Sequence, residues 1–551
     1  MGKCQWKPED ERLRRIYGEC PHAAEAGHEY CIFHISLEEK RKKPELKDRF
    51  KTEFRKLYER GDWDFTGFVF PDKMEPSKMA GYDFRRPHEK EGREAWAGEK
   101  TGPVIFREAK FGEGVDFDGA QFGRADFHYT EFSGHADFTN VEFGGEADFI
   151  SAKFRGKANF INVQFKGFAG FDSVKFGEHA FFWDSEFWDH AAFRRAEFSA
   201  KGGFEETIFH KFLDFSPVKG RASAYAGRGG RIGKEPAWEL ELFQPGPPVL
   251  VFEKVQFKGP AKFHSVDLSR TRFQQVDLRN LSFLHSQISK TKFISCLWGD
   301  GPEKSNRWHR ADKRWYRFRR PRLLFDELLW RKITQLRHHK KQAQEGEATK
   351  EQSDRGEPID QVDAMGGGSP YKDLQASDIE VLALQLKQSL EATKDPIPAG
   401  DFHFAAMEMK REQDLEMWRE SKKAVKEGKQ KGKAWACRLR AGGFWWYKML
   451  SGYGECYGRT LLWLSCLVLA AALAFAFWGG KTFAGYPGFW ARLEPALFFA
   501  VQHILPFKFG APVWEICPGD AVMRWLTLAE TITGTTLFTF FALALRRRFK
   551  R

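Results

Sequence analysis

Four residues near the amino terminus could bind a metal: Cys4, Cys20, Cys31 and His34. Thiolate and imidazole groups fill the tetrahedral shell of structural zinc, and the last two ligands form a Cys-x-x-His element. The leader, residues 1–45, is too short to build a core of its own, so bound metal would supply its folding energy. We predict one structural zinc ion, with no open position for a catalytic water. The alternative is a set of free thiols in a loosely ordered leader, because the 15-residue gap between Cys4 and Cys20 is irregular.

A second group of candidate residues lies near the carboxyl end. Pro495 to Phe507 is a 13-residue, largely apolar run. It is too short to span a bilayer and too hydrophobic for an exposed loop, which indicates a re-entrant or interfacial helix. Glu530 interrupts another apolar stretch, and a charge at membrane depth is a functional candidate by default. The pore-like residues of this region are Pro495, Gln502, Pro506, Lys508, Gly510 and Glu530.

Two stretches that flank this run are candidate transmembrane helices. Thr460 to Trp478 is 19 residues without a charge, and Trp525 to Leu545 is 21 residues interrupted only by Glu530. A helix of either length can cross about 30 Å of hydrocarbon. Basic residues precede the first stretch and form the tail 546–551 after the second, so both ends are predicted to be cytoplasmic.

The order of these elements resembles the two-transmembrane potassium-channel family over the last 90 residues. The resemblance implies ion permeation by a homo-oligomer, since two spans of one chain cannot enclose a pore. The filter departs from the family: where Thr-Val-Gly-Tyr-Gly is expected, the chain reads Leu505-Pro506-Phe507-Lys508-Phe509-Gly510. This run cannot build the stacked carbonyl rings, and Lys508 opposes cations. Potassium selectivity is therefore not carried over, and both a conducting hairpin and a non-conducting anchor stay open.

A phenylalanine repeat precedes these segments. Phenylalanine supplies 55 of the 551 residues, and from Phe106 to Phe215 it recurs at steps of five or six. Neither a helix nor a flat strand has this period, so the chain must turn a corner every five residues around a narrow core. The pattern resumes at Phe252, which gives 30 central residues in all, one for each corner. With four corners in each coil, they predict about seven coils. A disordered Phe-rich tract would not keep this phase. Typical predicted core residues are Phe127, Phe138, Phe149 and Phe160.

Units such as Ala125-Asp126-Phe127 and Ala136-Asp137-Phe138 resemble the pentapeptide-repeat family over residues 104–298. The resemblance implies a right-handed quadrilateral β-helix. The six-residue steps depart from the five-residue motif and leave the regularity of the corners open. Tyr30-Cys31-Ile32-Phe33-His34 also resembles an element that often opens bacterial pentapeptide-repeat membrane proteins. This second resemblance implies a location in the bacterial inner membrane.

The net charge and the cysteine content indicate which classes of partner and which compartment suit the protein. The net charge of +13 favours a polyanion, either nucleic acid or an anionic membrane. Some pentapeptide-repeat proteins mimic DNA, which requires an acidic surface, but residues 104–215 carry a net −7 and residues 252–298 a net +5. The two charges nearly cancel, so DNA mimicry is disfavoured. Nucleic acid is also a disfavoured partner, and the predicted partners are membrane lipid and a protein on the solenoid. Eight cysteines in this length do not make a disulfide scaffold, so most of the chain is expected in a reducing cytoplasm.

The remaining segments show no catalytic motif. Residues 46–103 read as an irregular and helical linker, and the insertion 216–248 contains Gly227 to Lys234, which resembles a phosphate loop only superficially because Glu235 follows the lysine. Residues 299–345 are basic and aromatic, and could contact nucleic acid, lie on a membrane or cap the solenoid. Residues 346–372 form a linker.

Residues 373–430 resemble a tetratricopeptide-like helical hairpin, with the second helix predicted from Gly400. His403 and Glu408 on that helix could form a catalytic pair, but a lone histidine on a helix is usually structural.

The predicted fold is mainly β, a right-handed quadrilateral β-helix with an α-helical connector and two transmembrane helices within 440–551. The predicted protein is not an enzyme. It is a membrane-anchored protein whose channel-like hairpin permeates ions or senses the envelope, with a non-conducting scaffold as the alternative.

Overall fold

The structure is a computed structural model that describes residues 2–9, 14–15, 19–73, 83–84, 103–216, 250–300, 322–344, 374–393, 396–426, 434–479, 482–483, 485–504 and 521–550. The chain forms two compact units. The first combines Met1–Gly299 with Leu324–Asp373, and the second combines Asp300–Leu323 with Leu374–Arg551.

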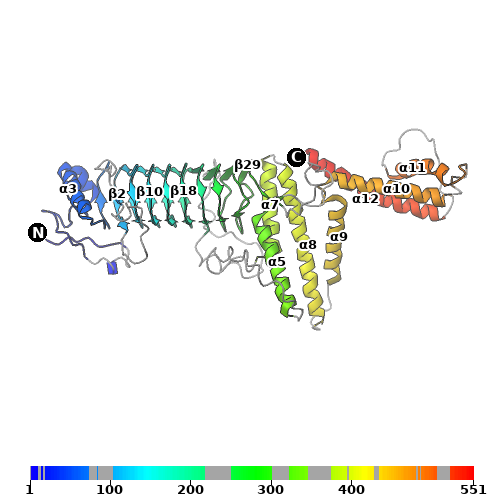
Figure 1. Ribbon diagram of the computed structural model, residues 1–551, viewed down its shortest axis with the longest axis horizontal. Coiled ribbons are helices and arrows are strands. Elements are labelled where there is room, and N and C mark those ends of the chain that lie inside the picture. The colour runs from blue at the N-terminus through cyan, green and yellow to red at the C-terminus, as the bar shows by residue number, and fades with distance from the viewer. Residues whose placement is uncertain are drawn as a thin grey trace. The chain divides into compact units, whose positions relative to one another are not determined.

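The first unit is a parallel β-solenoid of about seven coils, which confirms the predicted fold class (Figure 1). Its four faces are four parallel sheets. The first contains β1 (Val69–Phe70), β4 (Lys110–Phe111), β8 (Glu131–Phe132), β12 (Lys153–Phe154), β16 (Lys175–Phe176) and β20 (Glu197–Phe198). The second contains β2 (Asp83–Phe84), β6 (Gln121–Phe122), β10 (Glu142–Phe143), β14 (Gln164–Phe165), β18 (Glu186–Phe187), β22 (Ile208–Phe209) and β25 (Gln256–Phe257).

The other two faces carry the Ala-Asp units. The third sheet contains β3 (Val104–Ile105), β7 (Ala125–Asp126), β11 (Ala147–Asp148), β15 (Ala169–Gly170), β19 (Ala191–Ala192), β23 (Leu213–Asp214), β26 (Ala261–Lys262) and β28 (Leu281–Ser282). The fourth contains β5 (Val115–Asp116), β9 (Ala136–Asp137), β13 (Ala158–Asn159), β17 (Ala180–Phe181), β21 (Gly202–Glu205), β24 (Leu250–Glu253), β27 (Thr271–Gln274) and β29 (Lys292–Ile294). Two short strands, β30 (Gly299–Asp300) and β31 (Arg322–Leu323), follow.

The six-residue steps belong to regular corners of the coil. Ala147 pairs with Ala169, 22 residues later, because five- and six-residue steps alternate along this part of the chain. Five-residue corners turn through left-handed residues two positions after a core phenylalanine, such as Tyr129 (φ 57°) and Asn140 (φ 58°). At six-residue corners glycines stack: a Cβ on Gly156 would lie 2.6 Å from the Gly134 carbonyl carbon. In the last coils the corners are all five-residue, and Arg272 pairs with Lys292 only 20 residues later.

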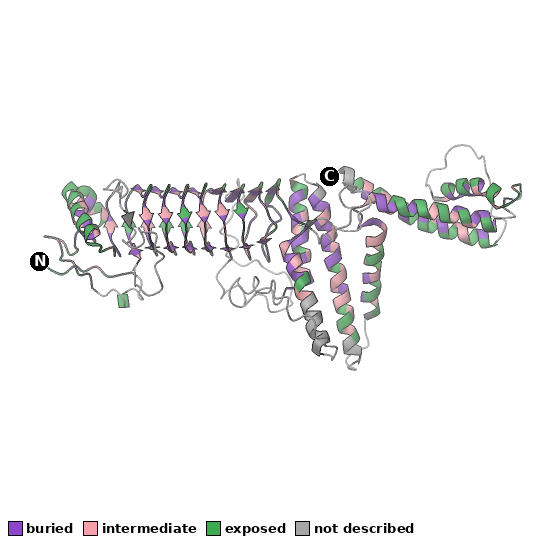
Figure 2. Ribbon diagram, viewed as in Figure 1, coloured by how far each residue is buried: buried purple, intermediate pink, exposed green. Residues whose placement is uncertain are grey.

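Ladders of phenylalanine rings fill the core. The predicted core residues Phe127, Phe138, Phe149 and Phe160 are all fully buried. Figure 2 shows buried positions, in purple, along the length of the solenoid. The rings of Phe127 and Phe149 stack with centroids 4.7 Å apart and planes 2° apart, whereas Phe149 meets Phe160 edge to face at 88°. Each such pair adds about 0.5–1.5 kcal/mol to the burial of its surface. The rings stack along the solenoid axis and make edge-to-face contacts across it. Together these contacts fix the register of each coil against the next.

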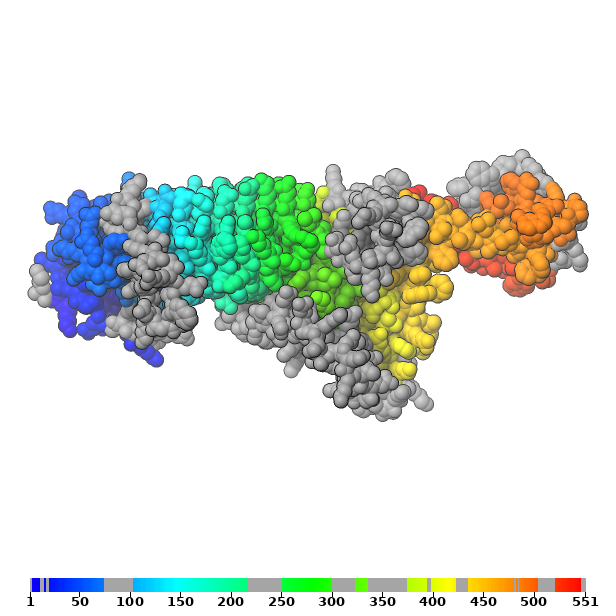
Figure 3. Space-filling model, viewed as in Figure 1, coloured from blue at the N-terminus to red at the C-terminus, as the bar shows by residue number. Residues whose placement is uncertain are grey.

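Helices close both ends of the solenoid. At the amino-terminal end, α2 (Leu37–Lys42) leads into α3 (Pro44–Arg60), whose buried Phe50 and Phe54 contact Phe70 of the first coil. In Figure 3 the atoms of this end are blue. At the other end, α5 (Phe325–Gln344) is anchored by the buried Asp326 carboxylate, which accepts hydrogen bonds from the Ser282 hydroxyl and, at 2.9 Å, from the Phe283 amide. The basic segment that precedes α5 lies outside the described residues, so its predicted capping role is untested.

The second unit is helical. It contains α7 (Ala376–Ala392), α8 (Pro396–Lys426), α9 (Ala434–Ser451), α10 (Tyr457–Trp478), α11 (Phe489–Ile504) and α12 (Ala521–Lys550). Helix α8 begins at Pro396, earlier than the predicted Gly400, because proline is tolerated in the first turn of a helix. Helices α10 and α12 are long and apolar enough to cross a membrane, over Tyr457–Trp478 and Ala521–Arg546.

Candidate metal centre

The four predicted ligands come together in one buried cluster, the metal cluster. It consists of Cys4, Cys20, Cys31 and His34, and the ligand atoms of all four lie within 4.8 Å of one another. Two backbone features build it. A turn before α2 places Cys31 and His34 side by side, with the His34 amide donating to the Cys31 carbonyl at 2.9 Å, and an antiparallel bridge between Lys3 and Ala23 brings Cys4 to the segment of Cys20.

The distances in the metal cluster fit a tetrahedral ion. His34 Nδ1 lies 3.5 Å from the sulfur of Cys4, 3.4 Å from that of Cys20 and 3.2 Å from that of Cys31. The sulfurs of Cys20 and Cys31 are 3.9 Å apart. Zinc–ligand bonds at tetrahedral angles place two sulfurs about 3.8 Å apart and a sulfur and a nitrogen about 3.6 Å apart. A disulfide needs about 2.05 Å, so the thiols are free to act as ligands.

The surroundings of His34 orient its ring for binding. Its Nε2 lies 3.4 Å from the carbonyl oxygen of Thr66. A carbonyl only accepts, so this contact assigns the proton to Nε2 and leaves Nδ1, which faces the three sulfurs, as the ligand atom. Trp6 stacks on the imidazole, and Phe68 meets it edge-on. These two rings fix the orientation of the imidazole.

Burial determines the protonation of the metal cluster when no ion is bound. The contact with the Cys20 thiol and burial raise the pKa of Cys31 to about 12, and burial raises the pKa of Cys4. Without an ion these thiols are therefore protonated, and a metal must displace their protons. The buried ammonium of Lys40 donates to the carbonyl oxygens of Phe33 and Val69, and burial lowers its pKa to about 7. A cation near the thiolates offsets part of the negative charge that three of them would bring.

The predicted pore-like residues do not gather in one described place. Pro495 and Gln502 lie in α11, which begins at Phe489, six residues before the predicted run, and contains Pro495 in its interior. Pro506, Lys508 and Gly510 lie outside the described residues. Glu530 lies on α12, where its side chain is buried within the second unit.

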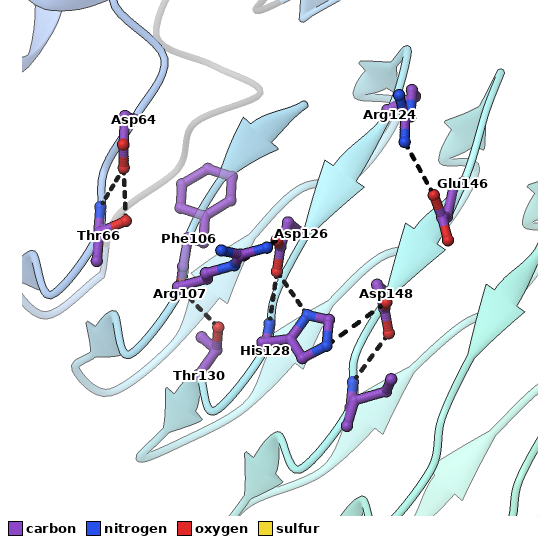
Figure 4. Close-up of polar contacts among 11 residues, drawn as sticks. Asp64, Thr66, Phe106, Arg107, Arg124, Asp126, His128, Thr130, Glu146 and Asp148 are labelled. Carbon is purple, nitrogen blue, oxygen red and sulfur yellow. Dashed lines mark hydrogen bonds and ion pairs between the residues drawn. The ribbon is translucent and has the colours of Figure 1, made fainter. Parts of the chain in front are cut away.

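Sequence reasoning missed a polar cluster on the third sheet of the solenoid (Figure 4). His128 Nδ1 lies 2.7 Å from the Asp126 carboxylate and its Nε2 lies 3.6 Å from Asp148, while Arg107 donates to Asp126 at 2.5 Å. Burial raises the pKa of Asp148 to about 6, against the opposing charge of His128. The signal was present: Asp126 and Asp148 follow alanines 22 residues apart, and the register pairs them.

Of the two hairpin residues His403 and Glu408, the second lies in a network of donors. Glu408 accepts hydrogen bonds from Arg411 at 2.8 Å, Lys448 at 3.0 Å and the Tyr453 hydroxyl at 2.9 Å. Although burial opposes it, these donors lower the pKa of Glu408 to about 2. A carboxylate held by three donors joins α8 to α9 and the turn after it, a structural task.

The comparison with protein families agrees with the solenoid. The model for pentapeptide repeats (9 copies) matches residues 101–142. The match covers the first coils of a parallel β-solenoid whose four sheets continue through residue 294, in a chain that also has two candidate membrane-spanning helices. Searches of the curated proteins and of the solved structures gave no match.

Proposed function

We propose that this protein is a membrane-anchored scaffold. Its pentapeptide-repeat solenoid binds a protein partner, α10 and α12 hold it in the membrane, and a structural zinc ion in the metal cluster fastens the amino-terminal cap. The exclusively Cys and His donor set, its burial and its tetrahedral spacing support zinc. We do not propose an enzymatic activity.

The burial of Glu530 supports a non-conducting scaffold rather than a channel. Its side chain is only 4% exposed within a single chain, and neither carboxylate oxygen has a hydrogen-bond partner among the described residues. It lies on the packed stripe of α12 with Met523 and Leu537, which are also buried. A pore-lining carboxylate would be hydrated and open to an axis outside the chain. The site instead suits an anchor whose helices pack on each other.

The runner-up is ion permeation or envelope sensing by a homo-oligomer. It draws on the order of α10, α11 and α12, which is the order of a span, a short helix and a second span.

The proposed location is the bacterial inner membrane with both ends in the cytoplasm. Arg438, Arg440 and Lys448 precede α10, and residues 546–551 carry five cations. Cationic flanks of this kind stay on the cytoplasmic side.

Reconstitution of the full chain into liposomes and planar bilayers tests the proposal, with Glu530→Gln as the matched variant. We expect the protein to resist alkaline extraction and to pass no current at any voltage or membrane tension. Glu530→Gln should remain integrated and be equally or more stable, because it removes an unpaired carboxylate from an apolar site. Current that changes in Glu530→Gln would overturn the scaffold in favour of the channel. Release by alkaline extraction would overturn membrane anchoring altogether.

A further inference from the structure

Helix α9 has two faces of different character. One face packs against α8: Cys437 and Ala441 are buried, Arg440 pairs with Asp414 at 2.9 Å, and the Arg438 guanidinium lies 5.2 Å from the ring centre of Trp418. Near the end of the helix, Lys448 bonds Glu408 of α8. This face is therefore already occupied by protein.

The opposite face carries an exposed apolar stripe, the α9 stripe, which consists of Trp435, Leu439 and Trp446. These side chains are 69%, 64% and 58% exposed. At 100° per residue they fall within about 40° of one another around the helix. Two indoles and a leucine facing water on one line are costly unless something covers them.

The composition of α9 indicates that a membrane surface covers the α9 stripe. Residues 434–451 contain three cations and no acidic residue, together with five aromatic residues. Aromatic side chains with one polar atom favour the headgroup level of a bilayer, and cations beside them favour anionic lipid. Arg438 and Arg440 contact α8 and are still exposed to solvent, so their positive charges border the α9 stripe on its two sides.

The position of α9 beside the candidate spans agrees with a location at the membrane surface. Its last turns touch the candidate spans: the Lys448 carbonyl accepts from Arg459 at 2.9 Å, the Met449 carbonyl accepts from Trp463 at 3.2 Å, and Tyr447 contacts Phe540. Its first turns instead follow α8, and within this unit α9 runs across the direction of α10 (Figure 1). A helix that crosses the direction of a span at the end of that span lies along the membrane surface.

We propose that α9 is an interfacial helix that inserts the α9 stripe into the headgroup region of an anionic membrane. The inference rests on the proposed function, because α10 must span the bilayer for α9 to lie on its surface. It adds a second attachment, parallel to the membrane, that braces α8 through Glu408, Asp414 and Trp418.

Site-directed spin labelling of the full chain tests this surface in liposomes of phosphatidylcholine with phosphatidylglycerol. Labels are placed through Leu439→Cys on α9, Leu469→Cys on the exposed side of α10, and Trp188→Cys on the solenoid, with the unsubstituted chain labelled in parallel as background. All three native side chains are exposed, so the labels fit without repacking. Oxygen, which concentrates in lipid, and a water-soluble nickel complex report the depth of each label.

We expect the label at 439 to lie at headgroup depth: its oxygen-to-nickel accessibility ratio should be several-fold above that at 188 and below that at 469. A ratio at 439 equal to that at 188, with 469 in lipid, would overturn the interfacial helix and leave the anchor intact. A label at 439 that neither reagent reaches would show that protein covers the stripe, a second copy or a partner, and would also overturn the inference. A water-exposed 469 would refute the anchor itself.

Discussion

The indole of Trp6 lies flat on the imidazole of His34, with ring centroids 4.3 Å apart and planes 1° apart. The stack presses the His34 ring against its neighbours while Nδ1 points to the three sulfurs. Gly67 makes room for it: a Cβ there would lie 1.9 Å from Trp6 Cζ2, and the backbone at φ +70° disfavours any side chain. One glycine and one indole therefore determine how the metal cluster is covered.

Truncating this cover should weaken metal binding. We expect Trp6→Ala to lower zinc affinity about tenfold, because ordered neighbours of a ligand typically contribute 10–100-fold. Competition with a chromophoric chelator measures the affinity. Gly67→Ala should act by displacing the same indole, so the double variant should lose little more than either single variant. Additive losses, or an equal loss in the exposed control Trp188→Ala, would contradict the stacking role.

Removing a ligand should abolish the metal site. Elemental analysis of the full chain is expected to give about one zinc per chain, lost in Cys31→Ser, because three ligands leave one coordination position to water. The variant should also unfold the amino-terminal cap at lower temperature, since binding energy contributes to folding. Cys296→Ser, on a half-buried cysteine of the last coil, is the matched control and should keep its zinc. A wild-type chain that carries no metal after expression in zinc-supplemented medium would refute the zinc centre.

A charge in the phenylalanine ladder should break the solenoid. Phe149 stacks between Phe127 and Phe171 and meets Phe138 and Phe160 edge-on. Phe149→Asp buries a carboxylate without a partner, at a cost of at least about 4 kcal/mol, whereas Phe149→Leu should cost about 1–2 kcal/mol. The rate of amide hydrogen exchange in the coils around residue 149 measures the loss of stability in each variant. Equal protection in the two variants would contradict the packed core.

The two carboxylates beside His128 should respond to pH with opposite signs. Burial raises the pKa of Asp148 to about 6 from 3.8, so its contribution to stability is full below about pH 4 and is lost as the pH rises through 6. Asp148→Asn should therefore be neutral at pH 4 and more stable than wild type at pH 8, by about 1–3 kcal/mol.

Asp126 is the matched control. Although burial opposes it, hydrogen bonding to His128 and the charge of Arg107 lower the pKa of Asp126, so its contribution is present above its ordinary pKa and is lost as the pH falls through the lowered value. Asp126→Asn should be less stable than wild type at pH 8. Thermal melting from pH 4 to 8 measures the stability of both variants relative to wild type. A change of the same sign at pH 8 in both variants would contradict the opposite pKa shifts of Asp148 and Asp126.

Periodicity in the sequence predicts the solenoid because each coil is made of local steps. The spacing of phenylalanine identifies the core positions, and the fully buried Phe127 and Phe149 confirm it. The corners were less predictable. Five- and six-residue steps look irregular in sequence, yet they alternate between left-handed corners such as Tyr129 and stacked glycines such as Gly156. A corner depends on the coil above and below it, which a local pattern does not contain.

The sequence by itself determined which residues could chemically bind a metal and which helices could cross a membrane, because ligand type, apolar length and charge are properties of the chain. Only the tertiary structure decided which groups meet. It brought Cys4 to Cys31, placed Trp6 on His34, and joined Glu408 to Lys448 of the next helix. It also placed Glu530 on a packed face. Burial and distance depend on contacts between segments far apart in the chain, and these contacts determine whether a charged side chain faces water or protein.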